Sequence, residues 1–243
     1  MKPLTFAKRC TKEILRDPLN LMFGLGFPVV ILLLLSAIQA NIPVSLFEIT
    51  HLTPGITVFG LSFITLFSST LIAKDRESAF LQRLYTTPLK ASDFILGYML
   101  PMIPIAMAQC TVCYLVAIIL GLPITVPILS AILMILPVAV FYISLGLLCG
   151  SVFSIKQVGG ICGALLTNLS AWLSGIWFDL TLMGGTFRSI AYALPFVHAV
   201  ELERAMLRND FSEAIVHLYP VLGYAVLTTV CAAWAFLRQM KKL

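Results

Sequence analysis

Charged residues are scarce in this chain, and their scarcity decides its class. Only 11% of the 243 residues are Asp, Glu, Lys or Arg, whereas 60% are hydrophobic and the mean hydropathy is +1.00. Long apolar segments cross about 30 Å of hydrocarbon as helices, because lipid offers the backbone no hydrogen-bond partners. The composition excludes an ordinary soluble domain and predicts an all-α integral membrane protein.

Six segments are apolar enough to span a membrane, and none of them contains Asp, Glu, Lys, Arg or His. The expected spans are residues 19–40, 54–73, 94–120, 127–153, 158–178 and 218–237. A charge at the bilayer centre usually marks an ion or proton path, so its absence argues against a carrier driven by protons or sodium. We expect one transmembrane domain over residues 1–243, with its energy supplied from outside the chain.

Motifs for catalysis and for nucleotide binding are also missing. The sequence contains no G-x-S-x-G, no H-E-x-x-H and no G-x-x-x-x-G-K-[ST]. Cys110 and Cys113 form a C-x-x-C pair, but the pair lies within the third expected span, where packing is the simpler role. We therefore expect a chain that is no enzyme, holds no metal and binds no ATP itself.

The basic residues that are present collect on one side of the expected topology. Thirteen of the sixteen Lys and Arg residues precede the first span, lie between spans two and three or four and five, or follow the last span. Since Lys and Arg are enriched in cytoplasmic loops, both termini should be cytoplasmic. The net charge of +5 then reflects topology and contact with membrane lipids, and requires no nucleic acid.

Residues 2–16 are expected to form an amphipathic interfacial helix. On a helical wheel, apolar residues such as Phe6, Cys10 and Ile14 separate from basic residues such as Lys8 and Lys12. A helix of this kind lies at the membrane surface, either as an anchor on anionic headgroups or as a contact for a partner protein. The sequence leaves both roles open.

A polar segment at residues 74–93, KDRESAFLQRLYTTPLKASD, separates the second and third expected spans and is called the island below. With the residues that follow, it resembles the same stretch of ATP-binding-cassette permeases of the type-2 exporter class, where R-E-x-x-x-L-x-R-L-x-x-T-P-L precedes I-L-G. The matching positions are Arg76, Glu77, Leu81, Arg83, Leu84, Thr87, Pro88, Leu89, Ile95, Leu96 and Gly97.

A second segment, ALPFVHAVELERAMLRNDF, precedes the last expected span. It is similar to that family's N-P-x-x-x-x-x-E-x-x-R pattern at Pro195, Glu201 and Arg204, with Leu194 in place of Asn. The alternative is that Glu203 and Arg204 belong to an ordinary solvated turn.

The resemblance implies a half-transporter. Such permeases dimerise, here most simply as a homodimer, and sit on two copies of a separate cytoplasmic ATPase that binds ATP and Mg²⁺. The resemblance also implies a multi-pass protein of the cell membrane, and a compact permease without a fused ATPase suggests the bacterial cytoplasmic membrane.

The island is expected to contain a short cytoplasmic helix that begins near residue 75. Pro88 should end it, because proline disfavours helical geometry in the residue before it. The family's coupling helix, which inserts into the ATPase, lies here. The residues predicted to couple the chain to the ATPase are Arg76, Glu77, Phe80, Leu81, Arg83, Leu84, Tyr85, Thr87 and Pro88. Their apolar members recur at helical spacing, and the alternative is that this stripe lies on the membrane surface.

Weakly polar stripes on the second and fifth expected spans suggest a substrate path. Family resemblance places these spans along the centre of the dimer. The candidate lining consists of Ser62, Phe63, Thr65, Ser69, Thr167, Asn168, Ser170, Trp172 and Ser174. Ser and Thr also hydrogen-bond to backbone or across packed helices, which is the alternative for each of them.

An aromatic, uncharged path suits a hydrophobic or amphipathic compound better than an ion or a sugar phosphate. The L-x-R-L-x-x-T-P form of the island also resembles the drug and antibiotic export branch of the family. We therefore expect ATP-driven efflux of such a compound. The alternatives are export of a polysaccharide or lipid-linked glycan and, outside transport, a membrane scaffold or sensor.

Overall fold

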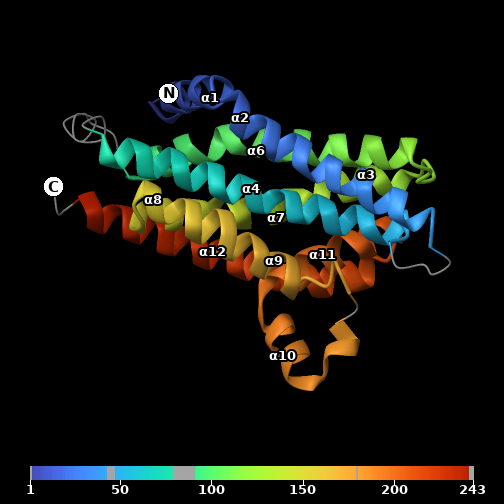
Figure 1. Ribbon diagram of the computed structural model, residues 1–243. Coiled ribbons are helices and arrows are strands. Elements are labelled where there is room, and N and C mark those ends of the chain that lie inside the picture. The colour runs from blue at the N-terminus through green and yellow to red at the C-terminus, as the bar shows by residue number, and fades with distance from the viewer. Residues whose placement is uncertain (1, 43–46, 79–90, 179, 241–243) are drawn as a thin grey trace.

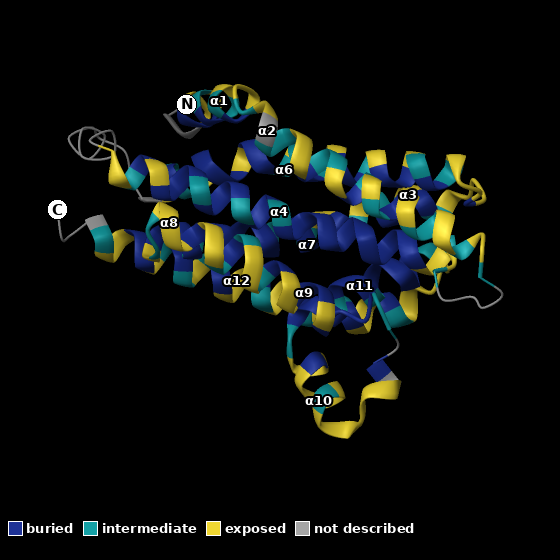
Figure 2. Cartoon of the chain, viewed as in Figure 1, coloured by how far each residue is buried: buried dark blue, intermediate teal, exposed yellow. Residues whose placement is uncertain are grey.

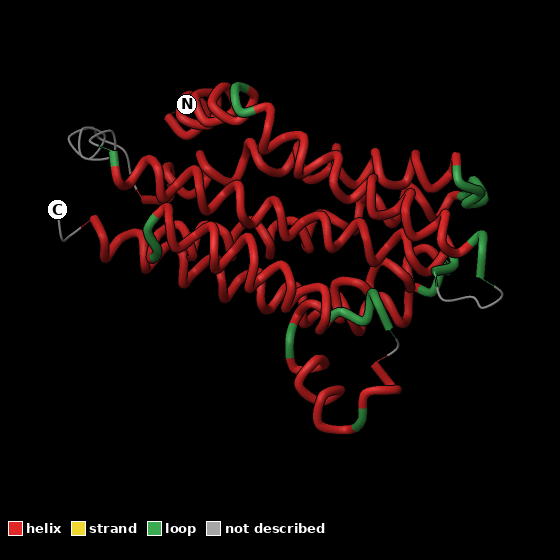
Figure 3. The backbone as a smooth tube through the Cα atoms, in the orientation of Figure 1, coloured by secondary structure: helices red, strands yellow, loops and turns green. Residues whose placement is uncertain are grey.

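The computed structural model describes residues 2–42, 47–78, 91–178 and 180–240 (Figure 1). The described residues are almost all helical and contain no strand (Figure 3). Among these described residues, five helices are long and apolar enough to cross a membrane, namely Met22–Gln39, Ile49–Glu77, Ser92–Ile119, Val126–Val152 and Phe211–Gln239. The predicted all-α class is confirmed, and five of the six expected spans coincide with these helices.

The helices follow one another as a bundle with short connections. In chain order they are α1 (Lys2–Leu15), α2 (Pro18–Leu21), the π-helix η1 (Met22–Gly26), α3 (Phe27–Gln39), α4 (Ile49–Glu77), α6 (Ala91–Ile119), α7 (Val126–Val152), α8 (Ile155–Val158), the π-helix η2 (Gly159–Leu166), α9 (Thr167–Leu173), the 3₁₀ turn η3 (Leu180–Met183), α10 (Gly185–Ala193), α11 (Pro195–Leu207) and α12 (Phe211–Met240). In Figure 1, α1, the last turn of α4, α8 and the end of α12 share one end of the bundle.

The centre of the bundle is α4, which is buried along almost its whole length (Figure 2). It packs most closely against α7, where Gly146 and Gly150 face Ser68 and Ser69. A Cβ at Gly146 would lie 1.9 Å from the Ser68 hydroxyl, and one at Gly150 would lie 2.5 Å from the main-chain oxygen of Ser69. The two glycines let the helix backbones approach in the small-xxx-small manner of membrane helices.

The expected fifth span is built differently from the single helix predicted over residues 158–178. Here α8, η2 and α9 succeed one another, and the wider π-helical turns occupy the glycine-rich stretch Gly159–Leu166. The helix ends at Leu173, and Gly175 at φ +70° turns the chain in the left-handed region that glycine tolerates best. This run is therefore not among the five long helices.

The segment before α12 is a pair of helices rather than a loop. In Figure 1, α10 projects away from the bundle, whereas α11 is inserted into it and packs on α4, α7 and α12. Most of α11 is buried, including Glu203 and Arg204. The alternative of an ordinary solvated turn at these two residues is therefore wrong.

The N-terminal helix α1 docks its apolar side on α6. The Phe6 ring lies 5.5 Å from that of Phe94 and 4.9 Å from that of Tyr98, centroid to centroid. Gly97 makes room for this contact, because a Cβ there would lie 2.2 Å from the Phe6 ring. The central apolar residues of α1, including Phe6 and Cys10, are thus covered by the chain itself, whereas Leu4 and Leu15 at its two ends remain exposed.

Candidate functional site

The last turn of α4, next to the island, is tied to two neighbouring helices through Asp75. This carboxylate is almost fully buried and accepts hydrogen bonds from both terminal nitrogens of Arg9, at 2.5 and 2.8 Å, and from the Tyr98 hydroxyl at 2.8 Å. Burial, the largest single influence, lowers the pKa of Arg9, but the hydrogen bonds to Asp75 and the charges of Asp75 and Glu13 together outweigh it and raise that pKa. We call Arg9, Asp75 and Tyr98 the α1 clamp, because they join α1, α4 and α6.

The next two residues of α4 hold the turn between α7 and α8. Arg76 donates to the main-chain oxygens of Ser151 and Phe153, which have no helical partner at the end of α7. Glu77 accepts from the amide of Ile155 at 2.8 Å and so satisfies the first amide of α8, next to the Ser154 cap. We call Arg76 and Glu77 the α8 clamp.

These two residues were predicted from the sequence to contact the ATPase. Within the described residues, their side chains bind the α7–α8 turn of the same chain, and contact with an ATPase remains a prediction. The other predicted coupling residues, Phe80, Leu81, Arg83, Leu84, Tyr85, Thr87 and Pro88, lie outside the described residues.

The predicted path residues of the second span are mostly buried and hydrogen-bonded inside the bundle. Ser62 and Ser69 donate to main-chain oxygens of their own helix at 2.7 and 2.9 Å. Thr65 donates across to the main-chain oxygen of Tyr142 on α7 at 2.7 Å. Phe63 is half-buried and packs edge-on against Phe27. Within a single copy of the chain, these three hydroxyls therefore hydrogen-bond to backbone and across packed helices, which is the alternative to a role in the substrate path.

The fifth-span residues divide into a buried and an exposed set. Thr167, Ser170 and Ser174 are buried, and Ser170 shares a 2.7 Å hydrogen bond with the Tyr142 hydroxyl. Asn168 and Trp172 are exposed, with Trp172 53% accessible. Tyr142, which the sequence analysis missed, joins α4, α7 and α9; no local pattern distinguishes it from other aromatic residues of the span.

Arg204 organises the opposite end of the bundle. Its guanidinium pairs with Glu201 at 2.7 Å and donates to the main-chain oxygens of Gly175 at 3.1 Å and His51 at 3.4 Å. Pro195 supplies the first helical position of α11, where a missing N–H costs nothing. The second sequence pattern thus forms a cluster, which we call the α11 clamp, joining α11 to the start of α4 and the end of α9.

A comparison with protein-family models shows which family the chain belongs to. The model for the ABC-2 type transporter matches residues 4–207, which run from α1 to the end of α11. The chain belongs to the ABC-2 type transporter family. No curated protein matches it. Membrane domains of this family generally work with an ATP-binding-cassette ATPase, and the chain is accordingly a transport subunit of the multi-pass membrane class.

The ABC-2 domain also buries one acidic residue from the segment between the fifth and sixth expected spans. Glu203 on α11 is fully buried and accepts a 3.3 Å hydrogen bond from the Tyr114 hydroxyl of α6. Its other carboxyl oxygen has no partner among the described residues. Burial raises the pKa of Glu203 well above its ordinary value, and the Tyr114 hydrogen bond only partly opposes this. The site therefore favours the protonated form of the carboxyl.

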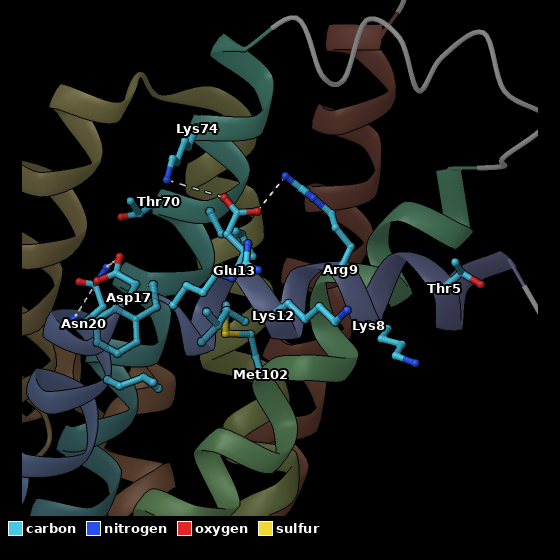
Figure 4. Close-up of a pocket in the computed structure, with 15 residues that line it drawn as sticks. Thr5, Lys8, Arg9, Lys12, Glu13, Asp17, Asn20, Thr70, Lys74 and Met102 are labelled. Atoms are coloured by element: carbon cyan, nitrogen blue, oxygen red, sulfur yellow. Dashed lines mark hydrogen bonds and ion pairs between the residues drawn. The ribbon is translucent and has the colours of Figure 1, made fainter.

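An open cleft of about 990 Å³ lies beside the α1 clamp, between α1, α2, α4 and α6 (Figure 4). Five basic and two acidic side chains line it, above apolar residues of α4 and α6. The described residues contain no group of three or more His, Cys, Asp or Glu that could hold a metal ion. The cleft is thus a basic, half-apolar cavity at the α1 end of the ABC-2 domain.

Proposed function

We propose that this chain is the membrane-spanning permease of an ATP-driven exporter that moves a hydrophobic or amphipathic compound out of the cytoplasm or inner leaflet. The observation that carries the proposal is the pair of clamps on consecutive residues of α4. Asp75 connects to α1 and α6, whereas Arg76 and Glu77 connect to the α7–α8 turn. A displacement of the island would therefore act on several helices through short polar contacts.

The ATPase is the proposed source of that displacement. Family membership supports a separate ATPase that binds ATP and Mg²⁺, and we propose two copies of it on a homodimer of this chain. The island follows α4 directly, so force applied there passes first to Asp75, Arg76 and Glu77. This arrangement fits a coupling segment better than a passive surface stripe, because clamps at its root would be unnecessary for a segment resting on lipid.

The proposed orientation puts the α1 end in the cytoplasm of a bacterial cell. The helix ends gathered there carry most of the basic residues, including Lys8, Lys12, Lys74 and Lys156, as the positive-inside rule requires. The α8–α9 run supplies the sixth crossing in this proposal. Its π-helical turns make it wider than a regular helix, and glycines let a partner helix approach.

The proposed substrate path runs between two copies of the chain. The exposed Asn168 and Trp172 of α9 and the half-buried Phe63 of α4 offer an aromatic face with one amide and no charge. Such a surface suits a hydrophobic or amphipathic molecule, including a drug, an antibiotic or a lipid. The buried hydroxyls of Ser62, Thr65, Ser69, Thr167, Ser170 and Ser174 would support this face from behind.

Co-purification and transport test the proposal together. The chain is purified in detergent from its native host with whatever ATPase co-purifies, then reconstituted in vesicles with a hydrophobic fluorescent dye. ATP-dependent dye movement and a stoichiometric ATPase are expected, and Leu84→Asp should abolish both. The matched control is Leu182→Asp, which adds the same charge at the highly exposed Leu182. A partner kinase or protease in place of the ATPase would favour a sensor or scaffold, and transport of a glycan instead of the dye would favour the polysaccharide branch.

A further inference from the structure

The cleft between α1 and α4 combines a basic rim with an apolar floor. We propose that it binds the headgroup of one anionic phospholipid from the adjacent leaflet. Three features of the cleft support this assignment: its basic side chains, the ion pairs and hydrogen bonds of its acidic residues, and its apolar lining. The assignment does not depend on which compound the permease transports.

The basic rim consists of Lys8, Lys12 and Arg16, which are spaced four residues apart and therefore form one stripe along α1. All three side chains are exposed, and none has an ion-pair partner among the described residues. Figure 4 shows Lys8 and Lys12 on the side of α1 away from the ion pairs of Arg9 and Glu13. The stripe thus offers positive charge that the surrounding protein does not neutralise.

The two acidic residues of the cleft are already engaged elsewhere. Glu13 pairs with Arg9 at 2.8 Å and with Lys74 at 3.7 Å. Asp17 accepts a 2.6 Å hydrogen bond from the Asn20 side chain. Neither carboxylate forms an ion pair with a basic side chain of the rim. The positive charge of the rim is therefore available to an anion from outside the chain. Phosphate oxygens are strong acceptors for such lysine and arginine donors.

The floor of the cleft is apolar. Phe67 and Leu71 of α4 and Met102 of α6 lie beneath the rim. Beyond α2, the chain continues into η1, where Met22 is 62% and Phe23 44% exposed. The cleft therefore passes from charge to hydrocarbon-like surface, which matches a lipid headgroup with its acyl chains better than a nucleotide or free phosphate. Its volume of about 990 Å³ also lies within the range of ligand pockets.

The position of α1 makes this a fixed site rather than a diffuse surface attraction. An ordinary interfacial helix buries its apolar face in the bilayer and is free to slide there. In this chain that face packs on α6 through Phe6, and the α1 clamp holds Arg9 to Asp75. The rim is consequently held at one place over the floor, as a specific headgroup site requires.

Lipid titration of the detergent-purified permease, followed by native mass spectrometry, tests the site. Phosphatidylglycerol is compared with phosphatidylcholine of the same acyl chains. In the double variant Lys8→Gln/Lys12→Gln, affinity for phosphatidylglycerol should fall about thirty-fold, since each basic residue near an anionic surface contributes about five-fold. The control, Lys156→Gln/Arg238→Gln, removes two cations outside the cleft and should change affinity less than about two-fold.

Two competition measurements distinguish a lipid site from a site for free phosphate. Inorganic phosphate and glycerophosphate are titrated as competitors, and neither should displace phosphatidylglycerol at comparable concentration. Displacement by either one would assign the cleft to a free phosphate and overturn the lipid. Equal losses in the two double variants would show diffuse surface charge and also overturn the site. Arg16→Gln alone, measured in parallel, should lower affinity about five-fold and provides a readout if the double variant folds poorly.

Discussion

Each end of the bundle is held by an arginine, but the two arginines use different partners. At the α1 end, Arg9 binds the side chains of Asp75 and Glu13 and is 34% exposed. At the α11 end, Arg204 is 4% exposed and binds two main-chain oxygens in addition to Glu201. The first arginine is therefore partly solvated and binds side chains, whereas the second is buried and binds backbone as well as Glu201.

This difference separates an adjustable end from a closed one. A pair of side chains can re-form after a small helix shift, because both partners have rotatable bonds. The carbonyls of His51 and Gly175 move only with their own chain segments, so a shift of α11 cannot carry these acceptors with it, and the buried Arg204 would lose them. The α1 end, which adjoins the island, is therefore the end that can adjust when the island is displaced, as coupling to a moving ATPase would require.

Arg204→Ala should give the largest loss of stability. It removes a buried cation together with its contacts to Glu201 and to the main-chain oxygens of Gly175 and His51, and removing one partner of a buried ion pair typically costs about 3–5 kcal/mol. A thiol-reactive dye that reports exposure of the buried cysteines measures the fall in unfolding temperature. Arg208→Ala, which breaks only the exposed pair with Glu213, is the control and should cost less than about 1 kcal/mol. Equal losses would contradict the closed end.

The Arg9–Asp75 pair should give a smaller but measurable coupling. Arg9→Gln, Asp75→Asn and the double variant form a cycle, with an interaction free energy of about 1–2 kcal/mol expected. The value is lower than the loss at Arg204 because Arg9 is a third exposed and solvent screens the pair. Thermal unfolding of the four proteins provides the measurement. Strict additivity would show that the clamp does not hold α1.

Glu77→Ala should separate stability from transport. Loss of the hydrogen bond to the Ile155 amide costs about 1 kcal/mol, because Ser154 still caps α8. Arg76 still holds the end of α7, but the direct link from α4 to α8, and so to the fifth crossing, is lost. We expect roughly tenfold less dye moved per ATP hydrolysed, a ratio equivalent to about 1.4 kcal/mol of coupling. Glu48→Ala, at the other end of the same helix, is the control. Unchanged coupling in Glu77→Ala would remove these residues from the coupling pathway.

The sequence predicted the helical architecture well, because hydropathy over about 20 residues reports burial in lipid directly. It also predicted the helix of residues 2–16 from its separated faces. It did not predict the break of the fifth span, where glycines permit both helix and π-helix and the choice depends on packing against α4. It left residues 179–217 outside the expected spans, because the apolar runs there are too short to span, and did not predict the helices α10 and α11 within them.

The polar clamps were harder to predict, because their partners lie far apart in the chain. Asp75 and Arg9 are separated by 66 residues, and Arg204 and His51 by 153. Arg76, Glu77 and Arg204 were singled out by family resemblance, but the motif gives no information about what they bind. Asp75, Tyr98 and Tyr142 carried no signal at all, since a single residue acquires its role only after the helices have packed.

Glu203→Gln should have the smallest effect at pH 5 and tests how closed the α11 end is. Glutamine has nearly the shape of the protonated acid and can still accept from Tyr114, so the expected change there is below about 1 kcal/mol.

The folded protein keeps the proton, whereas the unfolded chain releases it above about pH 4.5. The free energy of unfolding of the native protein should therefore decrease as pH rises from this value towards the raised pKa, by up to about 1.4 kcal/mol per pH unit. The glutamine variant should lack this slope and gain relative stability with pH. Parallel pH profiles of the two unfolding temperatures would mean that water reaches Glu203 and that the α11 end, like the α1 end, is open.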